Sequence, residues 1–158
     1  MTHSAYGPQT RHGCIIMASG TSTRFGANKL IAEIGGVPLI QHVLRATDGL
    51  YARRVVVTRH PDIARLCDMR GVEAVLHNEP LRNDTVRLGM EKMADCDTVT
   101  FVQGDQPLVS ANSLAACAAL IPRPGHYYSL LNITYENKKV ISLCSYCHAA
   151  ALCSFMRQ

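Results

Sequence analysis

The sequence predicts an α/β fold, a three-layer α/β/α sandwich around a mostly parallel sheet, and two observations support this prediction. Short runs of β-branched and apolar residues alternate with stretches whose apolar residues recur every three or four positions. The chain has 158 residues, 47% of them hydrophobic, and a domain of this size buries roughly 70% of its unfolded surface. Strands that alternate with helices form a parallel sheet covered on both faces, so the order of the elements predicts the class.

Four short β-rich runs predict strands, and the first two predict buried ones. Residues 13–18 form a continuous apolar run, and residues 53–58 contain three consecutive valines. Residues 72–76 and 98–102 are two further short β-rich runs, which predict a third and a fourth strand. Continuous apolar runs of this length are typical of strands that are buried on both faces.

Four stretches between and after these strands have helical spacing. The expected helices cover residues 38–46, 61–69, 84–93 and 110–120. Pro38 suits the first position of its helix. Asp84 is the expected cap of the third helix, and either Ser110 or Asn112 is the expected cap of the fourth.

Composition and charge exclude several classes of protein. The chain is too apolar for a disordered protein, and no apolar run reaches the roughly 20 residues of a membrane helix. The net charge of +4 comes without a basic cluster or interleaved aromatic residues, so we expect small-molecule partners and no nucleic acid. The first 12 residues lack the apolar segment of a secretion signal, so we expect a cytoplasmic protein with reduced cysteines.

The segment after the first expected strand has the composition of a phosphate-binding loop. Ligands of parallel sheets bind at the carboxyl ends of the strands, which directs attention to the segments after residues 18, 76 and 102. The first segment carries two glycines, the hydroxyl residues Thr21 and Ser22, and the cations Arg24 and Lys29. Such a loop can cradle a polyphosphate, but an ordinary glycine-rich surface loop has a similar composition. It matches neither the Walker loop nor the dinucleotide fingerprint.

Two further segments follow the third and fourth expected strands. Residues 77–89 form a polar loop that includes Asn78 and leads into a helix start at Asp84 and Thr85, where backbone N–H groups are free. Asp105 follows the fourth strand and is placed to hold Mg²⁺ together with substrate phosphate oxygens, although an Asx turn would use the same residue. Together the three segments predict a nucleotide site at one edge of the sheet.

The same residues carry a family resemblance. Residues 17–30, M-A-S-G-T-S-T-R-F-G-A-N-K-L, resemble the L-A-A-G-x-S-x-R-M-G-x-x-K-L signature of nucleotidyltransferases with the nucleotide-diphospho-sugar transferase (GT-A-like, Rossmann-like) fold. Residues 35–40, G-G-V-P-L-I, and 104–109, G-D-Q-P-L-V, look like the two elements that follow it in the MobA-like NTP transferase family. Within that family the chain is most similar to the molybdenum cofactor cytidylyltransferases, the MocA type.

The resemblance implies a reaction and a set of roles. Backbone around Ala18, Ser19 and Gly20 would hold the nucleobase, Arg24 and Lys29 would act on the triphosphate, and Asp105 would hold Mg²⁺. The acceptor, molybdopterin, would attack the α-phosphate of the nucleotide and release pyrophosphate. CTP is the favoured substrate, with GTP possible, because Ser19 stands where the guanylyl-transferring relatives carry glycine. The residues expected at the nucleotide are Ala18, Ser19, Gly20, Thr21, Ser22, Asn78 and Thr85.

Two alternative functions stay open. Residues 82–89 also resemble the R-x-x-S-V-x-x-G element of the isoprenoid-pathway cytidylyltransferases, with Thr85 at the nucleotide-contacting serine. The H-D-A-A-R-P element of that family is absent, and residues 104–107 stand in its place, so an isoprenoid or sugar-phosphate nucleotidyltransferase is the weaker interpretation. A catalytically impaired nucleotide-binding domain is the other alternative, because the later acidic residue of the relatives has no counterpart.

The motifs suggest three parts of the chain. We expect a flexible tail over 1–12, the NTP-binding domain over 13–121, and a divergent, incomplete or non-native segment over 122–158. No acidic residue follows Lys139, and either a divergent cap or a shifted or early-ended reading frame would explain this composition. Residues 144–148 spell C-x-x-C-H, the haem attachment string, which we interpret as a chance match because no export signal precedes it.

Overall fold

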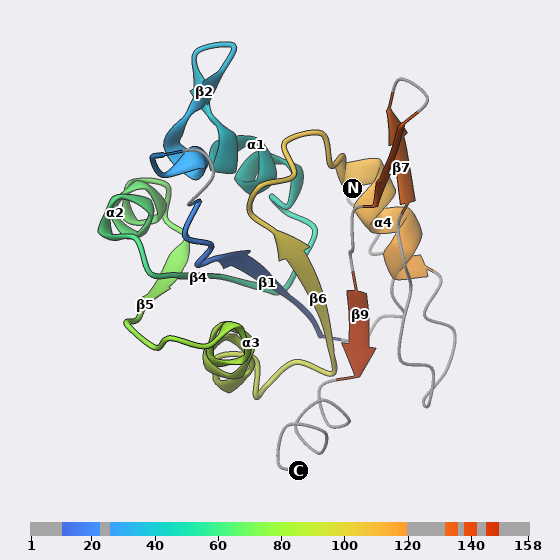
Figure 1. The fold of residues 1–158 in the computed structure, drawn as a ribbon. Helices are drawn as coiled ribbons and strands as arrows, with labels where there is room; N and C mark the ends of the chain where they lie inside the picture. The colour runs from blue at the N-terminus through green and yellow to red at the C-terminus, as the bar shows by residue number, and fades with distance from the viewer. Residues whose placement is uncertain (1–10, 23–25, 120–131, 136–137, 142–144, 149–158) are drawn as a thin grey trace.

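The centre of the computed structural model is a five-stranded sheet with the strand order β5-β4-β1-β6-β9 (Figure 1). The structure describes residues 11–22, 26–119, 132–135, 138–141 and 145–148. The strands of this sheet are β1 (His12–Ala18), β4 (Arg53–Thr58), β5 (Glu73–Leu76), β6 (Thr98–Gln103) and β9 (Ser145–His148). The first four run parallel, and β9 pairs antiparallel with the outer side of β6. Four of these strands were expected, each within one residue at either end.

The two faces of the sheet are covered by different helices. Successive side chains of β1 point to opposite faces, so Ile16 packs in one apolar cluster and Ile15 in the other. The helices are α1 (Leu39–Ala46), α2 (Pro61–Met69), α3 (Arg82–Glu91) and α4 (Ala111–Ala119). Side chains of α1, α2 and α4 pack around Ile16, and side chains of α3 pack around Ile15. The predicted three-layer α/β class is therefore confirmed.

Smaller elements extend from this sandwich. A short 3-10 helix (Lys29–Ile31) precedes the hairpin of β2 (Glu33–Ile34) and β3 (Val37–Pro38), which projects away from the sheet (Figure 1). A second hairpin joins β7 (Asn132–Tyr135) to β8 (Lys138–Ile141). None of the helices within the described ranges is long and apolar enough to cross a membrane.

The start of α3 differs from the expected one. The helix begins at Arg82, two residues before Asp84, and Asp84 is its third residue. The Asp84 carboxylate accepts a hydrogen bond from the backbone N–H of Leu81 at 3.1 Å, so it closes the first turn from inside. The cap of α4 is as predicted, because the Ser110 hydroxyl accepts from the backbone N–H of Ser113 at 3.1 Å.

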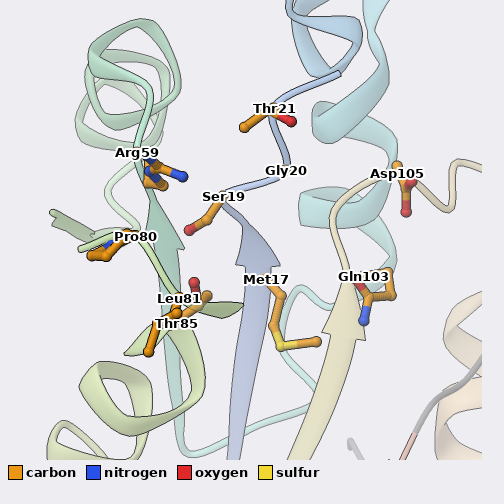
Figure 2. A pocket seen from close by; sticks show the side chains of 10 residues that line it. All are labelled: Met17, Ser19, Gly20, Thr21, Arg59, Pro80, Leu81, Thr85, Gln103 and Asp105. Carbon is orange, nitrogen blue, oxygen red and sulfur yellow. The ribbon is translucent and has the colours of Figure 1, made fainter. Parts of the chain in front are cut away.

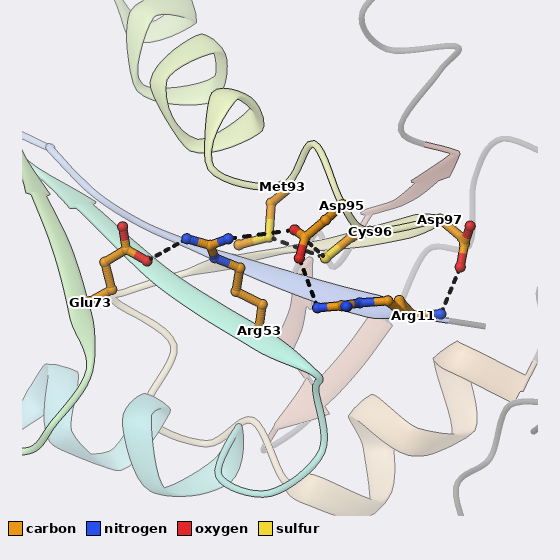
Figure 3. A network of polar contacts seen from close by, with 7 residues as sticks. All are labelled: Arg11, Arg53, Glu73, Met93, Asp95, Cys96 and Asp97. Atoms are coloured by element: carbon orange, nitrogen blue, oxygen red, sulfur yellow. Dashed lines mark hydrogen bonds and ion pairs between the residues drawn. The ribbon is translucent and has the colours of Figure 1, made fainter. Parts of the chain in front are cut away.

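An ion-pair network ties the amino ends of the strands together (Figure 3). Arg53 at the start of β4 reaches Glu73 at 3.0 Å and Asp95 at 3.5 Å, and Arg11 reaches Asp95 at 2.7 Å. The hydrogen bond from Arg53 lowers the pKa of the Glu73 carboxyl. These side chains are more than a third exposed, so each pair contributes little to stability, but their charges compensate one another at this edge.

His12 is a buried polar residue at the start of β1. Its ring stacks on Tyr51 with centroids 5.2 Å apart, and its Nε2 lies 2.6 Å from Thr100 Oγ1, while Nδ1 contacts Thr98 Oγ1. Burial lowers the pKa of the His12 imidazole from 6.5 to about 4. The fold therefore holds this ring neutral.

We expect His12 to make the fold sensitive to acid. Below pH 6.5 the unfolded chain binds a proton at His12 that the folded chain takes up only near pH 4, so stability falls as pH drops through this window. A shift of this size corresponds to on the order of 3 kcal/mol. Urea unfolding at pH 7, 5.5 and 4.5 should show this loss in the wild type and a smaller loss in His12→Gln. Equal pH dependence in the two proteins would contradict the assignment.

The close approach of α3 to β1 depends on Gly89. A Cβ atom built on Gly89 would lie 2.7 Å from Cγ2 of the buried Ile15, a distance that real contacts do not reach. The helix and strand therefore meet at a point where only glycine fits.

We expect Gly89→Ala to destabilise the fold by about 1–3 kcal/mol, the usual cost of overpacking. Helix propensity alone would make the alanine variant more stable by about 1 kcal/mol, so a loss of stability can be assigned to packing. The measurement is the free energy of unfolding in urea. Gly20→Ala is the matched control, since a Cβ there meets nothing within 4 Å; a stabilised Gly89→Ala protein would refute the packing argument.

Candidate functional site

A cavity of about 350 Å³ opens at the carboxyl ends of the parallel strands (Figure 2). It is lined by Met17, Ser19, Gly20, Thr21, Arg59, Pro80, Leu81, Thr85, Gln103 and Asp105. Its volume is within the range of small-molecule sites, which is about 300–1,000 Å³. Each of the three segments predicted from the sequence contributes to its wall.

Strand register explains why these segments meet. Ala18 of β1 pairs with Thr58 of β4, Thr58 pairs with Leu76 of β5, and Met17 pairs with Gln103 of β6. The four parallel strands therefore end at one level, and the chain leaves all of them at the same edge of the sheet.

The residues expected at the nucleotide are distributed unevenly. Ser19, Gly20, Thr21 and Thr85 line the cavity. Ala18 is buried beneath it, and its carbonyl accepts a hydrogen bond from Thr58 Oγ1 at 2.9 Å.

Three other expected residues lie elsewhere. Ser22 has a positive φ of 51°, and its hydroxyl accepts from the backbone N–H of Lys29 at 3.3 Å, so it shapes the loop. Asn78 is exposed and does not line the cavity. Arg24 lies outside the described residues.

Lys29 and Asp105 meet at the β6 side of the cavity. Lys29 Nζ lies 2.5 Å from Asp105 Oδ2, and both side chains are more than a third exposed. Gly104 positions Asp105: its N–H donates to the Met17 carbonyl at 2.9 Å, and a Cβ there would lie 3.1 Å from the same oxygen. The end of β6 thus presses closely on β1 and places a carboxylate beside a cation.

The residues present fit a magnesium ion that arrives with a substrate. Within the described ranges no group of three or more His, Cys, Asp or Glu side chains could hold a metal alone. Mg²⁺ in nucleotide enzymes commonly uses one or two carboxylates, substrate phosphate oxygens and water. Asp105 is exposed enough to serve as such a carboxylate.

His77 is a buried residue of the site that the sequence argument did not select. It directly follows β5, its Nε2 lies 2.9 Å from Ser19 Oγ and 3.5 Å from Thr85 Oγ1, and its Nδ1 accepts from the N–H of Glu79 at 3.2 Å. Burial, and next the charge of Arg59, lowers the pKa of the His77 imidazole. No sequence signal pointed to His77, because the structure alone shows that Leu76 is exposed and that the next side chain of this extended segment lies on the inner face.

Arg59 was also missed. It follows β4 directly and lines the cavity, and it makes no ion pair with any residue that the structure describes. The rule that ligands bind at strand ends applies to β4 as well as to the three strands chosen from the sequence. The site therefore has a cation on each side, Arg59 near β4 and Lys29 near β6.

Comparison with known proteins gives matches in sequence and in structure. Residues 14–152 match the sequence profile of the MobA-like NTP transferase domain, which continues past residue 121, where the motif resemblance ends. A 3-deoxy-manno-octulosonate cytidylyltransferase of Yersinia pestis bv. Antiqua (strain Angola) is 38% identical over 117 residues, which is 66% of this chain and 46% of the relative. A protein of the same name from Glaesserella parasuis is 38% identical over 100 residues, 60% of this chain and 39% of the relative. The chain thus spans less than half the length of these curated relatives.

Solved structures with low sequence identity share the fold. Rv0371c from Mycobacterium tuberculosis H37Rv has a TM-score of 0.73 at 15% identity, covering 94% of this chain and 77% of that one. A CMP:2-keto-3-deoxy-manno-octonic acid synthetase complexed with CTP has a TM-score of 0.69 at 17% identity, covering 94% and 78%. The expected nucleotidyltransferase fold is confirmed by these likenesses.

Proposed function

Because the chain belongs to the MobA-like NTP transferase domain family, we propose that its cavity binds a nucleoside triphosphate and transfers the nucleotidyl group to a small-molecule acceptor, releasing pyrophosphate. The observation that carries this proposal is the pair of Lys29 and Asp105 at the rim of the strand-end cavity. A cation and a carboxylate in contact are the two groups that a triphosphate and its metal ion need, and each can exchange its partner for a ligand atom.

The described side chains would act mainly through charge. The acceptor oxygen forms a bond to the α-phosphorus while the bond from that phosphorus to pyrophosphate breaks. Lys29 Nζ would neutralise the charge that builds up on the transferred and leaving phosphates, and Arg59 offers a second cation across the cavity. Asp105 would hold Mg²⁺, which when bound offsets phosphate charge. Arg24 stays a predicted triphosphate ligand.

CTP is the substrate we favour. The curated relatives at 38% identity are named cytidylyltransferases, and one solved structure of the same fold is described as complexed with CTP. Their names support 3-deoxy-manno-octulosonate as the first acceptor to test. A 4-diphosphocytidyl-2C-methyl-D-erythritol synthase from Anaerococcus prevotii also shares the fold, with a TM-score of 0.67. The molybdopterin acceptor rests on the motif resemblance alone and comes after these in order of testing.

A nucleotide-binding domain without turnover is the second candidate. Asp105 is the one carboxylate that lines the described part of the cavity, whereas two acids often share a metal ion at such sites. Pyrophosphate release with an acceptor separates the two candidates. An enzyme would bind CTP and release pyrophosphate, and a binding domain would only bind.

We expect Asp105→Asn to impair the reaction and Lys29→Met to impair nucleotide binding. Asp105→Asn should lower magnesium-dependent pyrophosphate release at least a hundredfold and retain CTP binding within about tenfold. Lys29→Met should weaken CTP binding by about tenfold or more, the effect of one charge-assisted hydrogen bond. CTP binding is measured by calorimetry with MgCl₂, and pyrophosphate by a coupled assay with each candidate acceptor.

Matched controls come from the opposite edge of the sheet. Asp48→Asn removes an exposed carboxylate that pairs with Arg54 at 2.6 Å, and Lys92→Met removes an ammonium that pairs with Glu73 at 3.2 Å. Neither should change binding or turnover. Wild-type activity in Asp105→Asn, or the absence of nucleotide binding in the wild type, would overturn the proposed function.

A further inference from the structure

A second cavity, of about 420 Å³, lies at the amino ends of β4 and β5, at the opposite end of the strands from the first. It is lined by Gln41, Leu44, Arg45, Asp48, Arg54, Arg70 and Val72. Its volume is within the range of small-molecule sites, about 300–1,000 Å³. The cavity is therefore large enough for a ligand of its own.

Three separate elements supply the arginines of this cavity. Arg45 lies in the last turn of α1, Arg54 is the second residue of β4, and Arg70 directly follows α2. The buried Leu44 and Val72 add an apolar part to the wall. α1 and α2 pack on the same face of the sheet, so the fold brings these distant positions together.

The carboxylate in the wall of the second cavity compensates one of the three arginines. Arg54 Nη2 donates to Asp48 Oδ1 at 2.6 Å, and Nη1 donates to the Leu44 carbonyl at 2.8 Å, so this guanidinium is used on the end of α1. Neither Arg45 nor Arg70 makes an ion pair with any residue in the described ranges. The wall of the cavity thus keeps an excess of positive charge.

A buried glutamine orients Arg70 without neutralising it. Gln41 is 5% exposed, and its amide oxygen faces the guanidinium, with Nη1 at 2.9 Å, Nε at 3.1 Å and Nη2 also in contact. The reversed amide would set donors against donors. A glutamate here would hold the arginine equally well and cancel its charge. The neutral amide holds Arg70 in the wall of the cavity and leaves the charge available to a ligand.

The chemistry of the wall suits a phosphate group. Guanidinium groups of like charge in one cavity raise each other's electrostatic energy, and an anion that contacts both relieves this repulsion. Arg45 comes one helical turn after Gln41, on the same side of α1, so both cations can reach one ligand. The planar fork of arginine matches two phosphate oxygens. A phosphate monoester carries a charge of about −1.5 to −2 at pH 7, which two arginines can balance.

We propose that the second cavity is a binding site for a phosphate group, either free or carried by a small molecule, and that Arg45 and Arg70 bind it. Gln41 is a positioning residue, because it acts through Arg70. The inference is independent of the proposed function, since the two cavities share no lining residue.

The test is a site-resolved NMR titration of the whole chain at pH 7. Sodium phosphate should shift the backbone amide signals of Leu44, Asp48 and Val72 in a saturable way, and sodium chloride at the same ionic strength should not. These signals report the second cavity alone, so phosphate bound beside Lys29 does not interfere. A parallel titration with glycerol 3-phosphate distinguishes the two sources, because the tighter ligand shows whether the site prefers free or esterified phosphate.

Variants assign the binding to individual side chains. Arg45→Gln and Arg70→Gln should each weaken phosphate binding at this site at least about tenfold, the effect of losing a charge-assisted hydrogen bond. Gln41→Glu should weaken it by a similar factor, because the new carboxylate would pair with Arg70. Arg65→Gln is the matched control, since it removes an exposed arginine of α2 that does not line the cavity. Thermal unfolding without ligand checks that each variant folds.

Several outcomes would overturn the inference. If Arg45 and Arg70 serve only to stabilise the carboxyl ends of α1 and α2, the wild type will show no phosphate-specific shifts. The assignment also fails if Arg65→Gln weakens binding as much as Arg70→Gln does, because the effect is then general attraction of an anion. A Gln41→Glu protein that folds and binds phosphate with the affinity of the wild type would refute the role of the neutral amide.

Discussion

The parallel pairing of β1 with β4 on one side and β6 on the other is the constraint on which the rest of the structure depends. β1 is buried on both faces, so its register is specified by which side chains enter each apolar cluster. A slip of one residue would exchange Ile15 and Ile16 between the faces. The same register aligns the carboxyl ends of four strands, and the cavity exists because the chain leaves all four at one level.

Backbone carbonyls of the central strands accept hydrogen bonds that position side chains of the site. The Met17 carbonyl receives the N–H of Gly104 and thereby places Asp105, and the Val57 carbonyl receives the hydroxyl of Ser19. Because carbonyls only accept and N–H groups only donate, the sheet determines both the position and the polarity of the groups around the cavity. A site built in this way is preorganised by the hydrogen bonds of the fold itself.

The two edges of the sheet differ in how their charges are compensated. At the amino edge Arg53 and Arg11 are matched by Asp95 and Glu73 (Figure 3). The second cavity, of about 420 Å³, is lined by three arginines; the donors of Arg54 are used on the Leu44 carbonyl and Asp48, whereas Arg45 and Arg70 make no ion pair with the residues that the structure describes. At the carboxyl edge, Arg59 makes no ion pair with any residue that the structure describes. Lys29 pairs with Asp105, whose carboxylate is also exposed to solvent. Arg59 and Lys29 thus place positive charge beside the cavity at the carboxyl ends of the strands.

Local patterns were sufficient to predict the elements and the edge of the sheet that carries the site. Short β-rich runs located four strands, helical spacing located four helices, and the glycines, Lys29 and Asp105 marked two of the loops. The start of α3 was placed two residues late, because the carboxylate of Asp84 closes the first turn from inside the helix rather than from its cap position.

The arrangement within the site depended on tertiary structure. Asn78 was selected and His77 passed over, because composition does not say which of two adjacent side chains turns inward. Arg59 joined the cavity only through the register of β4 against β1. The sequence by itself determined the strands, the helices and the edge at which they end, since these depend on neighbours in the chain. Only the tertiary structure decided which side chains share a hydrogen bond across that edge, because Ser19, Val57 and His77 are far apart in sequence and meet through strand pairing.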